Sequence, residues 1–195
     1  MSQLLLFLYP VEEYFVNQTG WREAFAFRRD YATALHETIE KRYRANGFCV
    51  SWVLFPDVRP SELAPIELRD QLITVDVPFN QSPSTYRYAS QEIIFAALPA
   101  VSHVRVAGFH LWDCVQRTAR EAHRRGIDTL VDEDLTELSA FRLVDRHRGI
   151  PESPRQAVFD PAVYQPPRIP PGFTGEHFLN VRSGKPWMAY RQPTA

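Results

Sequence analysis

The chain has 195 residues, which is long enough for one sizeable α/β domain and short for two. Its formal net charge of −1 provides no general field that would attract nucleic acid or an anionic membrane. Hydrophobic residues make up 45% of the chain, which excludes a disordered protein. Its two cysteines form neither a disulfide framework nor a zinc pattern, and the apolar start is too short to span a bilayer. We therefore expect a globular cytoplasmic protein.

The first half of the chain alternates strands with helical spacing. In order, we expect a strand over 4–8, a helix over 20–45, a strand over 48–55, a loop over 56–70 and a strand over 72–77. The first strand is a short apolar run, typical of a central parallel strand buried on both faces. Asn46-Gly47 ends the predicted helix, and Pro56 ends the second strand.

The second half continues the alternation. In order, we expect a polar loop over 78–88, a helix from Ser90 to Leu98, a strand over 104–107, a helix over 111–125, a strand over 127–131 and a helix from Thr136 to about Arg146. Strands alternating with helices imply right-handed crossovers and a doubly wound sheet. The predicted fold is a three-layer α/β/α sandwich with a mainly parallel sheet.

The composition changes after Gly149, where the last 46 residues hold nine of the sixteen prolines. We predict an α/β domain over 1–148 and a proline-rich, extended C-terminal arm over 149–195. Such an arm adds neither central strands nor a long helix. It is also too aromatic for a simple solvated tail, so it packs either on its own domain or across a neighbouring subunit.

Cys114 stands out because it falls in the first turn of the predicted helix over 111–125. Free backbone N–H groups and the helix dipole at that position favour the thiolate, so we expect a lowered pKa. His110 lies four residues earlier and can serve as the base of a Cys–His pair. Asp113 is a first-turn acidic residue whose negative charge would raise the pKa of the thiol.

The stretch around Cys114 carries a recognisable spacing. Gly108 is followed by Cys114-Val115, then Thr118-Ala119, Ala122 and Gly126. The pattern resembles the isochorismatase-like cysteine hydrolase superfamily, which includes nicotinamidases and N-carbamoyl amidohydrolases. That resemblance spans about the first three quarters of the chain and implies the family's α/β fold. It further implies a triad of Asp, Lys and a nucleophilic Cys.

Two members of that implied triad are missing here. Tyr9 stands where the family's aspartate ends the first strand, and a tyrosine with an ordinary pKa near ~10 is no resting base at neutral pH. No lysine occurs between residues 42 and 184, and Arg87, in the right general region, can supply only charge. Leu111 replaces the family's threonine. The sequence thus keeps the fold pattern and Cys114 without its partners.

The resemblance also bears on metals. The family's metal-binding branch carries Asp-x-His-Pro after its second strand, whereas this chain has Asp57 and Pro60 with Arg59 in place of the histidine. One carboxylate is not a metal site, so we expect no metal and no cofactor.

We expect any ligand to bind at the carboxyl ends of the strands, where sheets of this type hold their ligands. Tyr14 and Phe79 are candidates to line that place. The residues predicted to contact a ligand are Trp112, Asp113, Glu12, Asp57 and Arg59. Cys49, in the second strand, is expected to serve packing alone.

Three functions fit these observations. The favoured one is a descendant of the hydrolases that has lost the triad and binds a small molecule or a protein partner. The alternative is a rewired enzyme acting on a C–N or similar bond, with Cys114 as nucleophile and His110, Tyr9 or Glu12 moving protons. The third is a structural or assembly protein that uses the C-terminal arm. We expect a homo-oligomer that binds neither nucleic acid nor membrane.

Overall fold

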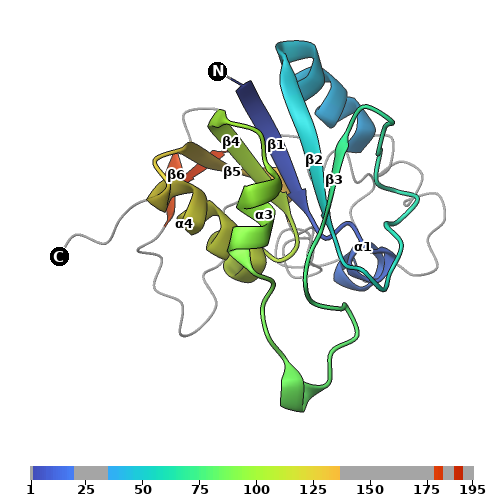
Figure 1. The fold of residues 1–195 in the computed structure, drawn as a ribbon. Helices are drawn as coiled ribbons and strands as arrows, with labels where there is room; N and C mark the ends of the chain where they lie inside the picture. The colour runs from blue at the N-terminus through green and yellow to red at the C-terminus, as the bar shows by residue number, and fades with distance from the viewer. Residues whose placement is uncertain (1, 20–34, 137–177, 182–186, 191–195) are drawn as a thin grey trace.

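The structure, a computed structural model, describes residues 2–19, 35–136, 178–181 and 187–190 (Figure 1). Its strands are β1 (Ser2–Leu8), β2 (Phe48–Leu54), β3 (Gln71–Thr74), β4 (Val101–Gly108), β5 (Asp128–Thr136), β6 (Phe178–Val181) and β7 (Trp187–Tyr190). Its helices are α1 (Glu12–Thr19), α3 (Gln91–Ala97) and α4 (Gln116–Arg124), with shorter turns at η1 (Ile39–Tyr43), η2 (Arg44–Asn46), η3 (Pro83–Thr85) and η4 (Leu111–Val115). None of the helices in these ranges has both the length and the hydropathy needed to cross a bilayer.

The strands form one sheet in the order β3-β2-β1-β4-β5-β7-β6. The first five strands pair in parallel, with β1 between β2 and β4, whereas β7 runs antiparallel to both β5 and β6. The chain starts at β1, moves outward through β2 to β3, and then returns to the other side of β1 for β4 and β5. The predicted mainly parallel α/β fold is confirmed.

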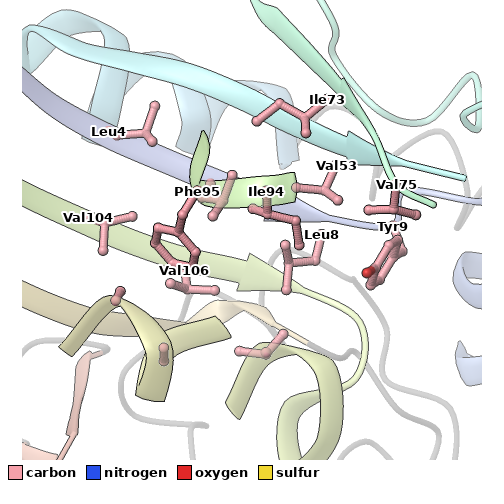
Figure 2. Packing of buried hydrophobic residues seen from close by; sticks show 14 of the residues in the cluster. Leu4, Leu8, Tyr9, Val53, Ile73, Val75, Ile94, Phe95, Val104 and Val106 are labelled. Atoms are coloured by element: carbon pink, nitrogen blue, oxygen red, sulfur yellow. The ribbon is translucent and has the colours of Figure 1, made fainter. Parts of the chain in front are cut away.

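Side chains of β1 alternate between two buried layers. Leu4, Leu6 and Leu8 belong to a cluster with α3 and α4 residues on one face, and Figure 2 shows Leu8 beside Ile94. Leu5 and Phe7 point to the opposite layer, which contains Leu35, Ile39 and Tyr43. Because successive residues of a strand face opposite ways, a continuous apolar run is what a strand covered on both faces requires.

Several element boundaries differ from the sequence-based predictions. The predicted helix over 20–45 is seen from residue 35 onward, and residues 20–34 lie outside the described residues. It ends, as predicted, at Gly47 with a left-handed φ of 79°. Helix α1 was not predicted, because its apolar residues show no clear helical period. Strand β5 continues to Thr136 instead of stopping at 131, and the helix expected from there to about Arg146 lies outside the described residues.

Two segments of the predicted arm are strands of the sheet. Strand β7 pairs with β5 from Leu130↔Ala189 to Asp132↔Trp187, and β6 pairs with β7 at the sheet's edge. These segments are therefore an extension of the α/β sheet within the same chain. The sequence analysis expected no central strand from the arm, and β7 and β6 lie beyond β5 at the outer end of the sheet, after the proline-rich run over 161–173.

Cys49 is exposed, which corrects the expectation that it serves packing. The reason is the register of its neighbours. Strand β3 pairs with β2 from Ser51 onward, so the start of β2 extends beyond the edge strand.

A buried carboxylate lies in the layer opposite α3 and α4. Asp132 of β5 is fully buried and accepts hydrogen bonds from the Arg42 guanidinium at 2.8 and 3.0 Å and from the Tyr43 hydroxyl. Charge-assisted bonds of this kind offset much of the cost of burying a charge. This cluster ties the turn after residue 38 to β5.

Candidate functional site

The carboxyl ends of β1 and β4 approach closely at the centre of the sheet. This is where the strand order reverses direction, the place at which open α/β sheets bind ligands. The Phe109 amide donates to the Leu8 carbonyl at 3.1 Å. Gly108, with φ of 102°, has no room for a side chain, because a Cβ would lie 2.2 Å from the Leu8 carbonyl oxygen. Gly108 is therefore required for β4 to turn beside β1 at this point.

Cys114 lies in η4, directly after this turn. The His110 carbonyl accepts from the Asp113 and Val115 amides, each at 3.1 Å, and so starts the helical turn that carries the thiol. The Cys114 side chain is half-buried and packs against the cluster on the α3 and α4 face. The predicted strand, turn and helix around Cys114 are all present.

The surroundings of Cys114 do not favour a thiolate. Burial and the neighbouring Asp113 carboxylate raise the pKa of the thiol to about 12, against smaller lowering effects of Arg117 and of a backbone hydrogen bond at His110. This is the opposite of the lowered pKa expected from the helix start. The predicted effect of Asp113 has the right sign.

Tyr9 directly follows β1 and is buried beside Val75 (Figure 2). Its ring stacks on Phe55 with centroids 4.3 Å apart, and its backbone has a left-handed φ of 56°. Burial, followed by the proximity of Cys114 and Tyr14, raises the pKa of its hydroxyl far above the ordinary range. At neutral pH Tyr9 therefore keeps its proton and does not act as the resting base that the family's aspartate would be.

Aromatic rings from three separate segments meet beside His110. The Tyr14 ring lies 4.5 Å from the His110 ring, 5.3 Å from Phe79 and 5.6 Å from Phe109, measured between centroids. Phe79 in turn lies 5.5 Å from Phe55. Tyr14 and Phe79 thus lie where the sequence analysis placed them, at the carboxyl ends of the strands. Burial and the nearby Cys114 also raise the pKa of the Tyr14 hydroxyl.

On the outer side of Cys114, residues of the loop over 78–90 meet helix α4. The Arg117 guanidinium lies 3.5 Å above the centre of the Tyr88 ring, and its Nε is 3.6 Å from Asp113 Oδ1. Tyr86 packs edge-on against Tyr88 at 5.4 Å. The sequence analysis missed Tyr86, Tyr88 and Arg117. Only Arg117 could have been found from the sequence, because it lies three residues after Cys114 and therefore on the same face of the predicted helix.

The structure does not bring the other four residues predicted to contact a ligand together beside Cys114 within the described residues. Glu12 accepts a hydrogen bond from Ser61, and Asp57 accepts from the Phe79 and Asn80 amides, which lowers the pKa of that carboxyl. Arg59 is exposed on the loop that carries Asp57. The side chain of Trp112 lies outside the described residues. Glu12 and Asp57 thus hold local backbone and loop structure.

The other charged groups considered for the site, Arg87 and a cluster around Glu40, pair with other residues. Arg87 donates to the Asp76 carboxylate and to the Asp76 carbonyl, both at 2.6 Å. Away from Cys114, oxygen and nitrogen atoms of His36, Glu40 and Glu67 lie within 4.8 Å of one another, close enough to share a metal ion. Arg44 and Arg69 pair with these two glutamates, however, and so supply their counter-charge.

Comparisons with known proteins give distant similarity. No protein-family description and no curated protein sequence matches the chain. Among solved structures, it is similar to an N-carbamoylsarcosine amidase from Thermoplasma acidophilum, with 19% identity and a TM-score of 0.47 over 70% of this chain and 84% of that one. It is also similar to the nicotinamidase/pyrazinamidase PncA from Bacillus subtilis, with 14% identity and a TM-score of 0.41 over 77% of this chain and 98% of that one.

Proposed function

We propose that this chain is a divergent member of the isochorismatase-like cysteine hydrolase superfamily that binds a small molecule without hydrolysing it. The family assignment is supported by the spacing from Gly108 to Gly126 and by the strand, turn and helix on which that spacing lies. The loss of hydrolysis is supported by the residues that surround Cys114. Function follows the chemistry of a site and not its fold.

One observation carries the proposal: burial and Asp113 raise the pKa of the Cys114 thiol to about 12. At neutral pH a thiol with that pKa is a thiolate in only about one molecule in 10⁵, and the thiolate is the nucleophile. A cysteine hydrolase would need a cation or a base that outweighs this, and Tyr9 supplies neither. The chain offers no lysine between residues 42 and 184.

The aromatic rings around His110 support a binding role. Tyr14 and Phe79 are half-buried aromatic rings, and Tyr14 lies edge-on to the imidazole with buried Phe109 behind it. Sites for small molecules combine such surface with a few polar groups. We therefore propose that the ligand is a small molecule with a planar portion that stacks against Tyr14.

Two other functions remain as alternatives. A rewired hydrolase would use Cys114 with His110, whose carbonyl and ring both lie at the site. An assembly protein would use the C-terminal segments, of which β6 already lies at the edge of the sheet. The rewired hydrolase requires a reactive thiol, whereas the proposed binding protein does not. The assembly protein requires no small-molecule ligand, so measurements of thiol reactivity and of ligand binding distinguish the three functions.

Nicotinamide serves as a neutral planar probe for turnover and for binding. We expect saturation-transfer NMR to show that it binds the wild-type chain and binds more weakly to Tyr14→Ala. We expect ammonia release to equal the rate without protein. Ammonia release that Cys114→Ala abolishes would establish the hydrolase, and wild-type binding no stronger than that of Tyr14→Ala would reject the proposed ligand site.

A further inference from the structure

The loop over 78–90 is fixed at both of its ends by carboxylates. Asp57 accepts from the Phe79 amide at 2.6 Å and from the Asn80 amide at 3.2 Å. Asp76 accepts from the Ser90 amide at 2.9 Å, just where the loop leads into α3. In Figure 1 the loop extends from the main body between β3 and α3, at the same end of the sheet as α1.

The middle of the loop is closed on itself. The Gln81 side chain donates to the Arg87 carbonyl at 3.0 Å and accepts from the Arg87 amide at 2.9 Å. Arg87 also donates to the Asp76 carboxylate. A segment that is braced in this way moves about its fixed ends as a unit more readily than it unravels.

Tyr88 connects this loop to the segment around Cys114, through its stack on Arg117 and through a hydrogen bond of its hydroxyl to Asp113. Tyr88 is 38% exposed, and half of the Arg117 side chain is exposed. Asp113 Oδ1 also lies 3.6 Å from the Arg117 Nε. A cation–π contact at an exposed site is weak, so it can open without disturbing the core.

The stack lies beside the thiol. Arg117 is one helical turn after Cys114, and Tyr86 and Tyr88 are close enough for the thiol to influence the pKa of both hydroxyls. Cys114 itself is mostly covered. A ligand that reaches the thiol from this side has to pass the two tyrosines.

We propose that the loop over 78–90 is a gate to the Cys114 site, held shut by the stacking of Tyr88 on Arg117. The inference rests on the proposed function, because it assigns the control of access to that same site. The gate opens by releasing Tyr88 from the helix while Asp57 and Asp76 keep the ends of the loop in place.

The test is the rate at which iodoacetamide, a neutral reagent, labels Cys114 in the folded chain at pH 9, divided by the rate for exposed Cys49. We expect Tyr88→Ala and Arg117→Gln each to raise this ratio by about two- to fivefold, as the loss of an exposed cation–π contact implies. Tyr88→Phe keeps the ring over Arg117 and loses only the hydrogen bond of its hydroxyl to Asp113, so it should raise the ratio less than Tyr88→Ala does. Arg124→Gln removes a charge from α4 that pairs with Glu121, and it should match the wild type.

Arg117→Gln distinguishes an effect on access to the thiol from an effect on the thiol's pKa, because the two change the labelling rate in opposite directions. Arg117 lowers the pKa of Cys114, so its loss through electrostatics alone would slow the labelling. Slower or unchanged labelling in both Arg117→Gln and Tyr88→Ala would overturn the gate. A different result would contradict the proposed function: fast labelling of wild-type Cys114 near neutral pH.

Discussion

Asp132, which is fully buried, and Cys114, which is half-buried, have opposite surroundings. Asp132 receives hydrogen bonds from a guanidinium and a phenol, so its negative charge is matched within the layer that covers β5. Cys114 faces tyrosines and a carboxylate, and burial raises the pKa of its thiol. The fold therefore stabilises the negative charge of Asp132, which supports the scaffold. It disfavours a negative charge on Cys114, the thiolate that a cysteine hydrolase would need. The predictions that follow alter one side of this comparison at a time.

The largest effect is expected from Gly108→Ala, which displaces the turn beneath the thiol. The added Cβ would meet the Leu8 backbone, which cannot move aside, and the positive φ adds strain. We expect a loss of about 4 kcal/mol in the free energy of unfolding, measured by urea denaturation. Gly126→Ala is the control, because it has a positive φ with open space around it, and should cost about 1 kcal/mol. Equal costs for the two variants would contradict the close approach of β1 and β4.

Removing the partner of the buried anion comes next. Arg42→Met removes from buried Asp132 a guanidinium that donates to both of its carboxylate oxygens, so we expect a loss of about 3 kcal/mol in the free energy of unfolding. Lys41→Met on the same turn removes an exposed pair with Glu37 and should change stability by less than about 0.5 kcal/mol. A cost for Arg42→Met as small as that of the control would mean that Asp132 does not depend on the guanidinium.

A smaller effect is expected on the pKa of Cys114 when its acidic neighbour is replaced. Asp113→Asn removes a negative neighbour that raises the pKa of the thiol, so the midpoint of the labelling profile should fall by less than about one pH unit. Burial remains the larger cause, and the midpoint should stay above that of an ordinary cysteine. The measurement is alkylation of the folded variant across pH, followed by peptide mass spectrometry. A midpoint that rises in Asp113→Asn would contradict the assigned sign.

The smallest effect concerns Asp76, which holds one end of the loop beside the thiol. Bonds from the Ser90 amide and Arg87 lower the pKa of its carboxyl in the folded chain. Its contribution to stability is therefore present above the unfolded pKa near ~4 and is lost as pH falls through the lower folded pKa. We expect Asp76→Asn to cost less than about 1 kcal/mol at pH 7 and nothing near pH 2. A cost that persists at pH 2 would point to a cause other than the carboxylate charge.

The sequence predicted the elements whose pattern is local. The apolar run of β1, the left-handed stop at Gly47 and the turn before Cys114 depend on nearby residues, and each was predicted at its position. Strand β7 was missed because its partner, β5, lies more than fifty residues earlier in the chain. Helix α1 was missed because its apolar spacing is weak.

The site was harder to predict than the fold. Its position followed from the strand order, and Tyr14 and Phe79 were anticipated. The pKa of Cys114 was predicted in the wrong direction, because a sequence shows the helix start but not how deeply the side chain is covered. The Tyr88–Arg117 stack joins a loop to a helix, and no local spacing indicates such a pair.

The central claim is that Cys114 is not an activated nucleophile. It is tested most directly by the pH dependence of iodoacetamide labelling of Cys114 in the folded wild-type chain, with Cys49 as the internal reference. We expect Cys114 to stay nearly unlabelled up to about pH 9.5, while exposed Cys49 reports that the reagent is active. A Cys114 midpoint below ~8.5, the value of a cysteine in a model peptide, would contradict the account and would establish a thiolate prepared for covalent catalysis.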